Sequence, residues 1–304
     1  MSNFQKSILA TVAYFDIFDY PLTLAELWQW HYGFGSGGEA SLAEIESVLA
    51  DLPGLASFNG FYFLSGRQAI VSTRLARYNI AEDKFVWARR AVWLLSKLPF
   101  IRLVTICNTL SYSNARAESD IDLFVITAKN RIWTARLFSI FIFQFLGWRP
   151  SPGRQQNKIC LSFFTAEDNL DLRVATRGDN DIYFHFWLAT LLPLYDAGGY
   201  YDSLLKANSW LKGYLPNVLG VELSQRRKIK PCFSLAKKLL EYQPIFLEKI
   251  YAYLQFTFMG QKLKKMINQD TRVMVTNRIL KFHPVDRREE YEQLWRRKIA
   301  NLLF

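Results

Sequence analysis

The sequence predicts an α+β protein in which a buried sheet is flanked by helices. Three observations predict this class. Short apolar runs at 103–107 and 123–127 are continuous rather than alternating, which is typical of strands covered on both faces, and residues 158–164 predict a third strand. Amphipathic helical spacing occurs on either side of these runs. The first part of the chain, up to residue 66, adds helix-capping boxes and a hairpin signal.

The N-terminal segment predicts helices followed by a hairpin. Residues 23–26 (Thr-Leu-Ala-Glu) and 41–44 (Ser-Leu-Ala-Glu) are capping boxes, each placing Glu three residues after the cap. Asn59 and Gly60 separate two short apolar runs, which predicts a two-residue hairpin turn. With the helix that precedes residue 23, this is the composition of a winged helix. We therefore expect residues 1–66 to be a winged-helix domain.

The third helix of this module argues against DNA binding. It carries Glu44, Glu46 and Asp51, and residues 41–51 contain no Lys or Arg. An acidic recognition helix would be repelled by the phosphate backbone, which supplies most of the binding free energy. A structural or protein-contact role is favoured, and a sequence-specific DNA regulator stays as a separate hypothesis.

The rest of the chain predicts a core and a helical tail. Residues 67–178 are expected to be the core domain, opened by a leading helix over 67–98 that is broken near Asn79. Residues 179–304 are expected to be a helical, basic domain, beginning with an apolar helix at 181–194. The basic residues of the leading helix are expected to form a solvated face: Arg74, Arg77, Arg89, Arg90 and Lys97.

The net charge of +11 is concentrated at one end of the chain. Residues 221–304 contain 18 Lys and Arg against 8 Asp and Glu, a net of +10, whereas residues 1–220 contain 20 against 19. Phosphate-bearing partners are attracted to such a region. The basic tail therefore favours a phosphate-rich acceptor, such as a nucleic acid.

The cysteines and the apolar runs predict a cytoplasmic protein. Cys107, Cys160 and Cys232 lie far apart without metal-ligand spacing, which is typical of free thiols in a reducing compartment. No basic segment followed by an apolar core opens the chain, so no secretory signal is expected. The longest apolar run, 137–146, is shorter than the ~20 residues that span a bilayer, so no membrane partner is expected.

The polar loop between the first two apolar runs ends in Asp120-Ile121-Asp122. Because side chains alternate along a strand, both carboxylates point to one face. Two carboxylates at this spacing repel each other unless a cation lies between them, and such hard oxygen ligands suit Mg²⁺ or Mn²⁺. The alternative interpretation is two acids that fray the start of a strand.

The order of these features resembles the nucleotidyltransferase superfamily (DNA polymerase beta-like). Its signature is an apolar strand, Gly-Ser, a loop, and Asp-x-Asp opening the next strand. The match covers Val104–Thr127 and is most specific at Ser119–Leu123. A looser resemblance, carried by 208–210 (Asn-Ser-Trp) and 215–217 (Leu-Pro-Asn), is to bacterial proteins that join a winged helix, a nucleotidyltransferase core and a helical tail.

The resemblance implies a mixed sheet and a metal-dependent reaction. Asp120 and Asp122 would hold Mg²⁺ (or Mn²⁺), and a nucleoside monophosphate would pass from a nucleoside triphosphate to an acceptor hydroxyl. Asn108 and Thr109 stand where the family has Gly-Ser, and Asn tolerates the left-handed backbone conformation. The residues expected at the phosphates are Asn108, Thr109 and Ser119, with Arg116 or Lys158 as an added cation.

The third strand departs from the family. It often carries a third carboxylate that acts as general base and metal ligand. In residues 158–164 neither face has an acid, and Ser162 is expected to take that place. Beyond the strand come Glu167, Asp168 and Asp171, interpreted as a solvated turn. The departures motivate a second hypothesis, a catalytically degenerate nucleotide-binding or protein-interaction module that keeps the fold.

Overall fold

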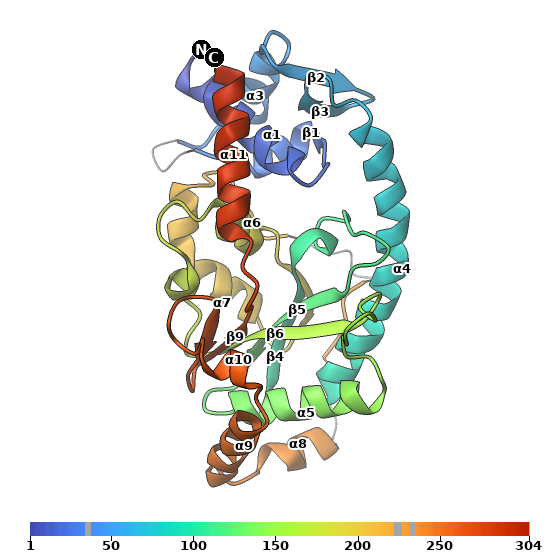
Figure 1. Ribbon diagram of the computed structural model, residues 1–304, viewed down its shortest axis with the longest axis vertical. Helices are drawn as coiled ribbons and strands as arrows, with labels where there is room; N and C mark the ends of the chain where they lie inside the picture. The colour runs from blue at the N-terminus through green and yellow to red at the C-terminus, as the bar shows by residue number, and fades with distance from the viewer. Residues whose placement is uncertain (34–37, 222–226, 232–234, 304) are drawn as a thin grey trace.

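The computed structural model describes residues 1–304 except 34–37, 222–226, 232–234 and 304. A small N-terminal module lies at one end of the molecule, a mixed sheet occupies the middle, and α5, α8 and α9 lie at the other end (Figure 1). The long helix α4 runs along one side from the N-terminal module to the sheet. The expected α+β class is confirmed.

The helices of the described residues are α1 (Asn3–Asp16), α2 (Leu24–Gln29), α3 (Leu42–Leu49), α4 (Ile70–Lys97), α5 (Ile132–Phe145), α6 (Ile182–Ala189), α7 (Tyr200–Ala207), α8 (Leu235–Glu241), α9 (Phe246–Thr257), α10 (Gln261–Lys264) and α11 (Arg288–Leu303). The strands are β1 (Leu22–Thr23), β2 (Leu55–Phe58), β3 (Phe61–Leu64), β4 (Ile101–Ile106), β5 (Ile121–Thr127), β6 (Ile159–Ala166), β7 (Leu192–Asp196), β8 (Val273–Val275) and β9 (Ile279–Phe282).

The strands form two sheets. The N-terminal sheet has the order β1-β3-β2 and is antiparallel. The central six-stranded sheet has the order β7-β4-β5-β6-β9-β8. Only β5 and β6 pair in parallel, and α5 makes the crossover between them. The central sheet is therefore mixed.

The local signals of the N-terminal module are confirmed. Thr23 and Ser41 cap α2 and α3 through complete capping boxes. Asn59 and Gly60 have φ values of 51° and 78° and join β2 to β3, because a two-residue hairpin turn needs positive φ at both positions. A further capping box, from Ser2 to Gln5, begins α1.

The long helix differs from expectation in two ways. It runs unbroken through Asn79 from Ile70 to Lys97. Its basic face is only partly solvated, because Arg74 pairs with Glu26 at 2.6 Å and Arg77 with Asp19 at 3.1 Å. These ion pairs hold α4 against the N-terminal module.

Residues 179–304, expected to be helical, contribute three strands to the central sheet. The expected helix at 181–194 ends at Ala189, and Leu192–Asp196 pairs with β4 instead. The hairpin of β8 and β9 pairs with β6. A continuous apolar run does not distinguish a buried helix from a buried strand. These segments form strands because the edges of the sheet offer them backbone hydrogen-bond partners.

The central sheet is covered on both faces. One face, with Val104, Leu123 and Val125, packs against α4 and α5. The opposite face, with Phe124 and Phe163, packs against α6 and joins the core of the N-terminal module. Asp122 alternates with Leu123 and so lies on this second face.

The last helix ties the two ends of the chain together. α11 lies against α1, and both termini lie at the same end of the molecule (Figure 1). The Trp295 indole donates to the Ala10 carbonyl at 2.8 Å, and Lys298 pairs with the buried Asp16 carboxylate at 2.6 Å. The N-terminal module is therefore fixed to the rest of the molecule by the C-terminal helix as well as by α4.

Candidate functional site

Asp120 and Asp122 lie at the start of β5, on the face that meets α6. Asp120 precedes the strand and Asp122 is its second residue. Asp122 pairs in register with Cys160 of the parallel strand β6. One ligand atom from each of Asp120, Asp122 and Cys160 lies within 4.8 Å of the others, and this is the metal-ligand group found in the described parts of the chain.

Asn108 is joined directly to this group. It has φ of 59°, the left-handed conformation that we expected an Asn to accept, and it begins a single 3₁₀ turn after β4. Its amide Nδ2 donates to Asp122 Oδ2 at 2.7 Å, and Tyr183 of α6 donates to its Oδ1 at 3.1 Å. The Asn108 side chain therefore orients a carboxylate, and Tyr183 orients Asn108.

The third side chain of the group is Cys160 rather than Ser162. The pairing of β5 with β6 shifts between Asp122 and Phe124, so Ser162 falls in an irregular part of the strand. The Ser162 hydroxyl bonds to His283 Nε2 at 2.9 Å. Because side chains alternate along a strand, the sequence indicates that Cys160 and Ser162 share a face of β6. The register between β5 and β6, which sets Cys160 opposite Asp122, is known only from the structure.

The electrostatics of the group are unfavourable without a cation. Burial, followed by the charge of Asp122, raises the pKa of Asp120 to about 7. Burial also raises the pKa of Asp122, and burial together with the Asp122 charge raises that of the Cys160 thiol. A cation would reverse these shifts, since it favours the charged forms. The two carboxylates fit Mg²⁺ or Mn²⁺, whereas a thiolate suits softer ions.

Lys84, which the sequence analysis did not single out, holds the loop before Asp120. This α4 lysine is buried and donates to the carbonyls of Ala117 and Ser119, at 3.0 and 2.6 Å, and to Asn157 Oδ1 at 2.9 Å. Burial lowers its pKa. A signal was present, because Lys84 falls at helical spacing among the apolar residues Ala81 and Ala88.

The other residues expected at the phosphates are dispersed. The Ser119 hydroxyl donates to the Arg116 carbonyl at 2.9 Å, and the Arg116 side chain is exposed. The Lys158 ammonium donates to the Gly147 carbonyl at 2.5 Å, just after α5. Thr109 lines a small cavity among aromatic side chains of α1 and α6. Of these positions, only Asn108 makes a side-chain contact with the Asp pair.

A larger cavity of about 210 Å³ begins at Asn108. Aromatic side chains supply much of its wall, and the Tyr183 and Tyr291 rings stack with their centroids 5.2 Å apart. The lining residues are Asn108, Phe163, Tyr183, Phe184, Trp187, Lys281, His283, Val285, Asp286, Arg287, Arg288 and Tyr291. Asp122 therefore lies one hydrogen bond from an enclosed, aromatic-walled space.

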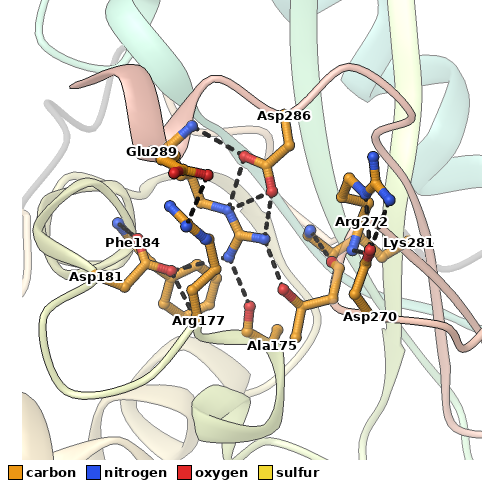
Figure 2. Close-up of polar contacts among 11 residues, drawn as sticks. Ala175, Arg177, Asp181, Phe184, Asp270, Arg272, Lys281, Asp286 and Glu289 are labelled. Atoms are coloured by element: carbon orange, nitrogen blue, oxygen red, sulfur yellow. Dashed lines mark hydrogen bonds and ion pairs between the residues drawn. The ribbon is translucent and has the colours of Figure 1, made fainter. Parts of the chain in front are cut away.

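The far wall of this cavity is held by Arg288. Its buried guanidinium pairs with Asp181 at 2.8 Å and Asp286 at 2.7 Å, and it also donates to the Ala175 carbonyl at 2.9 Å and the Thr271 hydroxyl at 2.7 Å. Figure 2 shows Asp181, Ala175 and Asp286 converging from different parts of the chain. Each carboxylate of the cluster faces the guanidinium, so the cluster acts as a structural clamp.

Two further titratable groups line the cavity. Burial, followed by the charge of Arg288, lowers the pKa of Lys281 to about 7, and its ammonium donates to the Thr271 carbonyl. Burial lowers the pKa of His283 to about 3. Within the described residues, His283 Nδ1 is buried without a hydrogen-bond partner. His283 is thus neutral and part of the cavity wall.

The thiols and apolar helices bear on two other expectations. Cys107 and Cys160 are free, buried and half-buried respectively, and Cys232 lies outside the described residues. None of the helices over the described parts of the chain has the length and hydropathy needed to cross a bilayer.

Comparison with protein-family models, with curated proteins and with solved structures finds no match to this chain. The functional argument therefore rests on the residues of the site.

Proposed function

We propose that this protein is a nucleotidyltransferase that binds a nucleoside triphosphate with Mg²⁺ or Mn²⁺ at Asp120 and Asp122. The reaction would transfer a nucleoside monophosphate to an acceptor hydroxyl. The observation that carries the proposal is the convergence of two half-buried carboxylates with raised pKa values at the start of β5. The strand order supports it, since β4, a polar loop, β5 and a parallel β6 follow the order of the family's signature.

The residues of the chain prepare the site in three ways. Asn108 fixes the orientation of the Asp122 carboxylate through its 2.7 Å hydrogen bond. Lys84 fixes the loop that delivers Asp120. The parallel register of β5 and β6 sets Cys160 opposite Asp122. When bound, the metal ion supplies positive charge that stabilises the phosphate groups during transfer.

The cavity beside Asn108 supports binding of a planar ring close to the metal ligands. Its wall contains the aromatic side chains of Tyr183 and Trp187 and the polar groups of Lys281 and His283. A few polar groups in an aromatic cavity are typical of small-molecule sites. The nucleoside or an aromatic acceptor suits this space.

The N-terminal module supports a winged helix with a structural or protein-contact role. α3 exposes Glu44 and Glu46 to solvent, as expected from the sequence. An acidic helix of this kind disfavours DNA. The attachment of the module to α4 and α11 supports a structural part.

A second candidate function is nucleotide binding without transfer. It is favoured by Cys160, which occupies the place of a third carboxylate. His283, on the cavity wall, has a pKa of about 3. A general base works best with a pKa near the operating pH, so His283 would be a weak one. In this candidate function, the protein would bind the metal and the nucleotide but would not catalyse the transfer.

One experiment tests the proposal and separates the candidates. Thermal unfolding would be followed with each nucleoside triphosphate, with and without Mg²⁺ or Mn²⁺, on wild type, Asp122→Asn and the control Asp202→Asn, an exposed acid of α7. A ligand that binds only the native state raises the midpoint. Both candidates predict a metal-dependent rise that is lost in Asp122→Asn and kept in the control.

Pyrophosphate release then decides between them. Release above the Asp122→Asn background, with a pool of acceptors present, supports transfer. A metal-dependent rise in the midpoint without release supports binding alone. No rise with any nucleotide would remove both candidates.

A further inference from the structure

α5, α8 and α9 lie at the end of the molecule farthest from the N-terminal module (Figure 1). This end carries an unusual number of exposed apolar side chains. We name this surface the α8–α9 face. Tyr242 is 74% exposed, Tyr253 is 71% and Phe258 is 85%. Its residues are Leu239, Leu240, Tyr242, Ile245, Phe246, Ile250, Tyr253, Leu254, Phe256 and Phe258, and α5 adds Phe141, Phe145 and Leu146.

This face is not a loosely attached segment. α9 packs along α5, and Gln255 bonds to Arg136 and to the Trp133 carbonyl, at 2.6 and 2.8 Å. Yet α9 has no buried residue. The helix contacts the protein through Gln255 and through the partly buried Tyr251 and Ala252. Most of its other large apolar side chains, among them Phe246, Tyr253 and Phe256, are exposed to solvent.

On the same helices, the acidic side chains lie toward the core and most of the lysines lie toward solvent. Residues 235–265 contain two acids, and both are turned toward the core. Glu241 accepts from the Phe100 backbone and from Arg102, each at 3.2 Å. Glu248 accepts from the Trp133 and Thr134 backbone amides, at 2.6 and 3.1 Å, where it caps α5. The lysines exposed on α8–α10 and at the end of α10 are Lys238, Lys249, Lys262 and Lys265.

We propose that the α8–α9 face binds the surface of a membrane rich in anionic lipid. Aromatic and aliphatic side chains would enter the boundary between headgroups and acyl chains, and the lysines would contact lipid phosphates. Exposed apolar groups beside lysines on a helix are the composition of interfacial membrane binding. This differs from spanning a bilayer, which was the basis for expecting no membrane partner from the sequence. The inference is independent of the nucleotide site.

Two other occupants fit these observations less well. A second copy in a two-fold contact would bring the lysines of one face toward those of the other, and like charges at an interface are costly. A single-stranded nucleic acid would stack on the aromatic rings, but much of the face is aliphatic and offers no ring. An anionic apolar surface complements both the charge and the composition.

Vesicle flotation tests the proposal with the full chain. Vesicles of phosphatidylcholine alone are compared with vesicles that also contain phosphatidylglycerol. We expect the protein to float with the anionic vesicles at low salt and to remain below with the neutral ones. Added salt should weaken the binding, since it screens the lysines.

Matched variants locate the contact. Tyr253→Ser with Phe258→Ser should weaken binding by more than about tenfold, because two exposed aromatic rings lose their apolar burial. The control, Leu75→Ser with Tyr78→Ser, removes two exposed apolar side chains of α4 and should have no effect. All four positions are exposed, so folding, checked by the thermal midpoint, should be kept.

A second pair tests the charge. Lys238→Gln with Lys249→Gln should weaken binding to anionic vesicles roughly 25-fold at low salt, at about fivefold per lysine. The control is Lys206→Gln with Lys212→Gln, on and after α7. The proposal is overturned if anionic vesicles do not bind, or if the face variants bind as wild type does. It is also overturned if light scattering shows a dimer that the Tyr253→Ser, Phe258→Ser variant dissociates.

Discussion

Two clusters of charged side chains lie at or next to the same cavity, and they differ in the sign of the charges that face one another. Around Arg288, one guanidinium faces the carboxylates of Asp181 and Asp286, and its donors are used in ion pairs and hydrogen bonds. Around Asp122, two carboxylates and a thiol face one another. Among the described residues, the side-chain nitrogen that donates a hydrogen bond to Asp122 belongs to the neutral amide of Asn108.

The difference shows how to separate a clamp from a ligand site. A cluster in which opposite charges face one another lowers the free energy of the folded state and needs no further ligand. A cluster of like charges raises that free energy unless a proton or a cation joins it. Burial alone would have marked both clusters as candidate sites. The sign of the neighbouring charges favours a structural role for the Arg288 cluster and makes the Asp pair the candidate ligand site.

The largest expected effect is the loss of the clamp. Arg288→Met should destabilise the protein by about 3–5 kcal/mol, because Asp181 and Asp286 would stay buried without a partner. Urea unfolding measures this. The control Arg287→Met removes an exposed pair with Glu290 and should cost no more than about 1 kcal/mol. Equal losses in the two variants would contradict the assignment of Arg288 as a clamp.

The second effect is a pH dependence of the metal-free protein. The folded-state pKa of Asp120, about 7, lies above the unfolded value near 4, so the native state binds more protons between these limits. Stability should therefore fall as pH rises from about 4 to 7, by on the order of 3 kcal/mol. Chemical unfolding across this range measures the change.

The Asp120→Asn variant is the matched test of this pH dependence. Its stability curve should be flatter over the same range, because the titrating carboxyl is gone. At neutral pH, added Mn²⁺ should restore the stability of the wild-type protein and should leave the stability of the variant unchanged. A wild-type curve that rises with pH over this range would contradict the assignment.

A third effect concerns the orientation of Asp122. Asn108→Ala removes the side chain that donates to the carboxylate, and partners of this kind typically contribute about 10–100-fold to metal affinity. Calorimetric titration with Mn²⁺ measures the loss. Asn114→Ala serves as a control, because Asn114 bonds to the Phe18 carbonyl, away from the Asp pair. Equal affinity in wild type and Asn108→Ala would show that this contact does not support the site.

The smallest effect is expected for Tyr183, which contacts Asn108 rather than Asp122. Tyr183→Phe removes the hydroxyl that donates to Asn108 and should cost about 0.5–1.5 kcal/mol of stability. The loss of Mn²⁺ affinity should be smaller than in Asn108→Ala, because Asn108 still bonds to Asp122. A larger loss than in Asn108→Ala would reverse the order of these contacts.

Much of the local structure could be predicted from the sequence alone. Capping boxes at Thr23 and Ser41, the turn at Asn59 and the helix at 132–145 depend on interactions between near neighbours in the chain. The Asp-x-Asp pair and the left-handed Asn108 are of the same kind. Their residues carry enough local information because the interacting groups lie within a few positions of one another.

Other features were decided by tertiary structure. The apolar run at 192–196 became a strand because β4 offered an unpaired edge, and residues past 178 closed the other side of the same sheet. Cys160 joined the Asp pair because a parallel register, with an irregularity after it, set it opposite Asp122. Lys84 reaches Ala117 across 33 positions of the sequence, and Arg288 reaches Asp181 across 107. Contacts over such separations depend on how the elements pack, which no local pattern records.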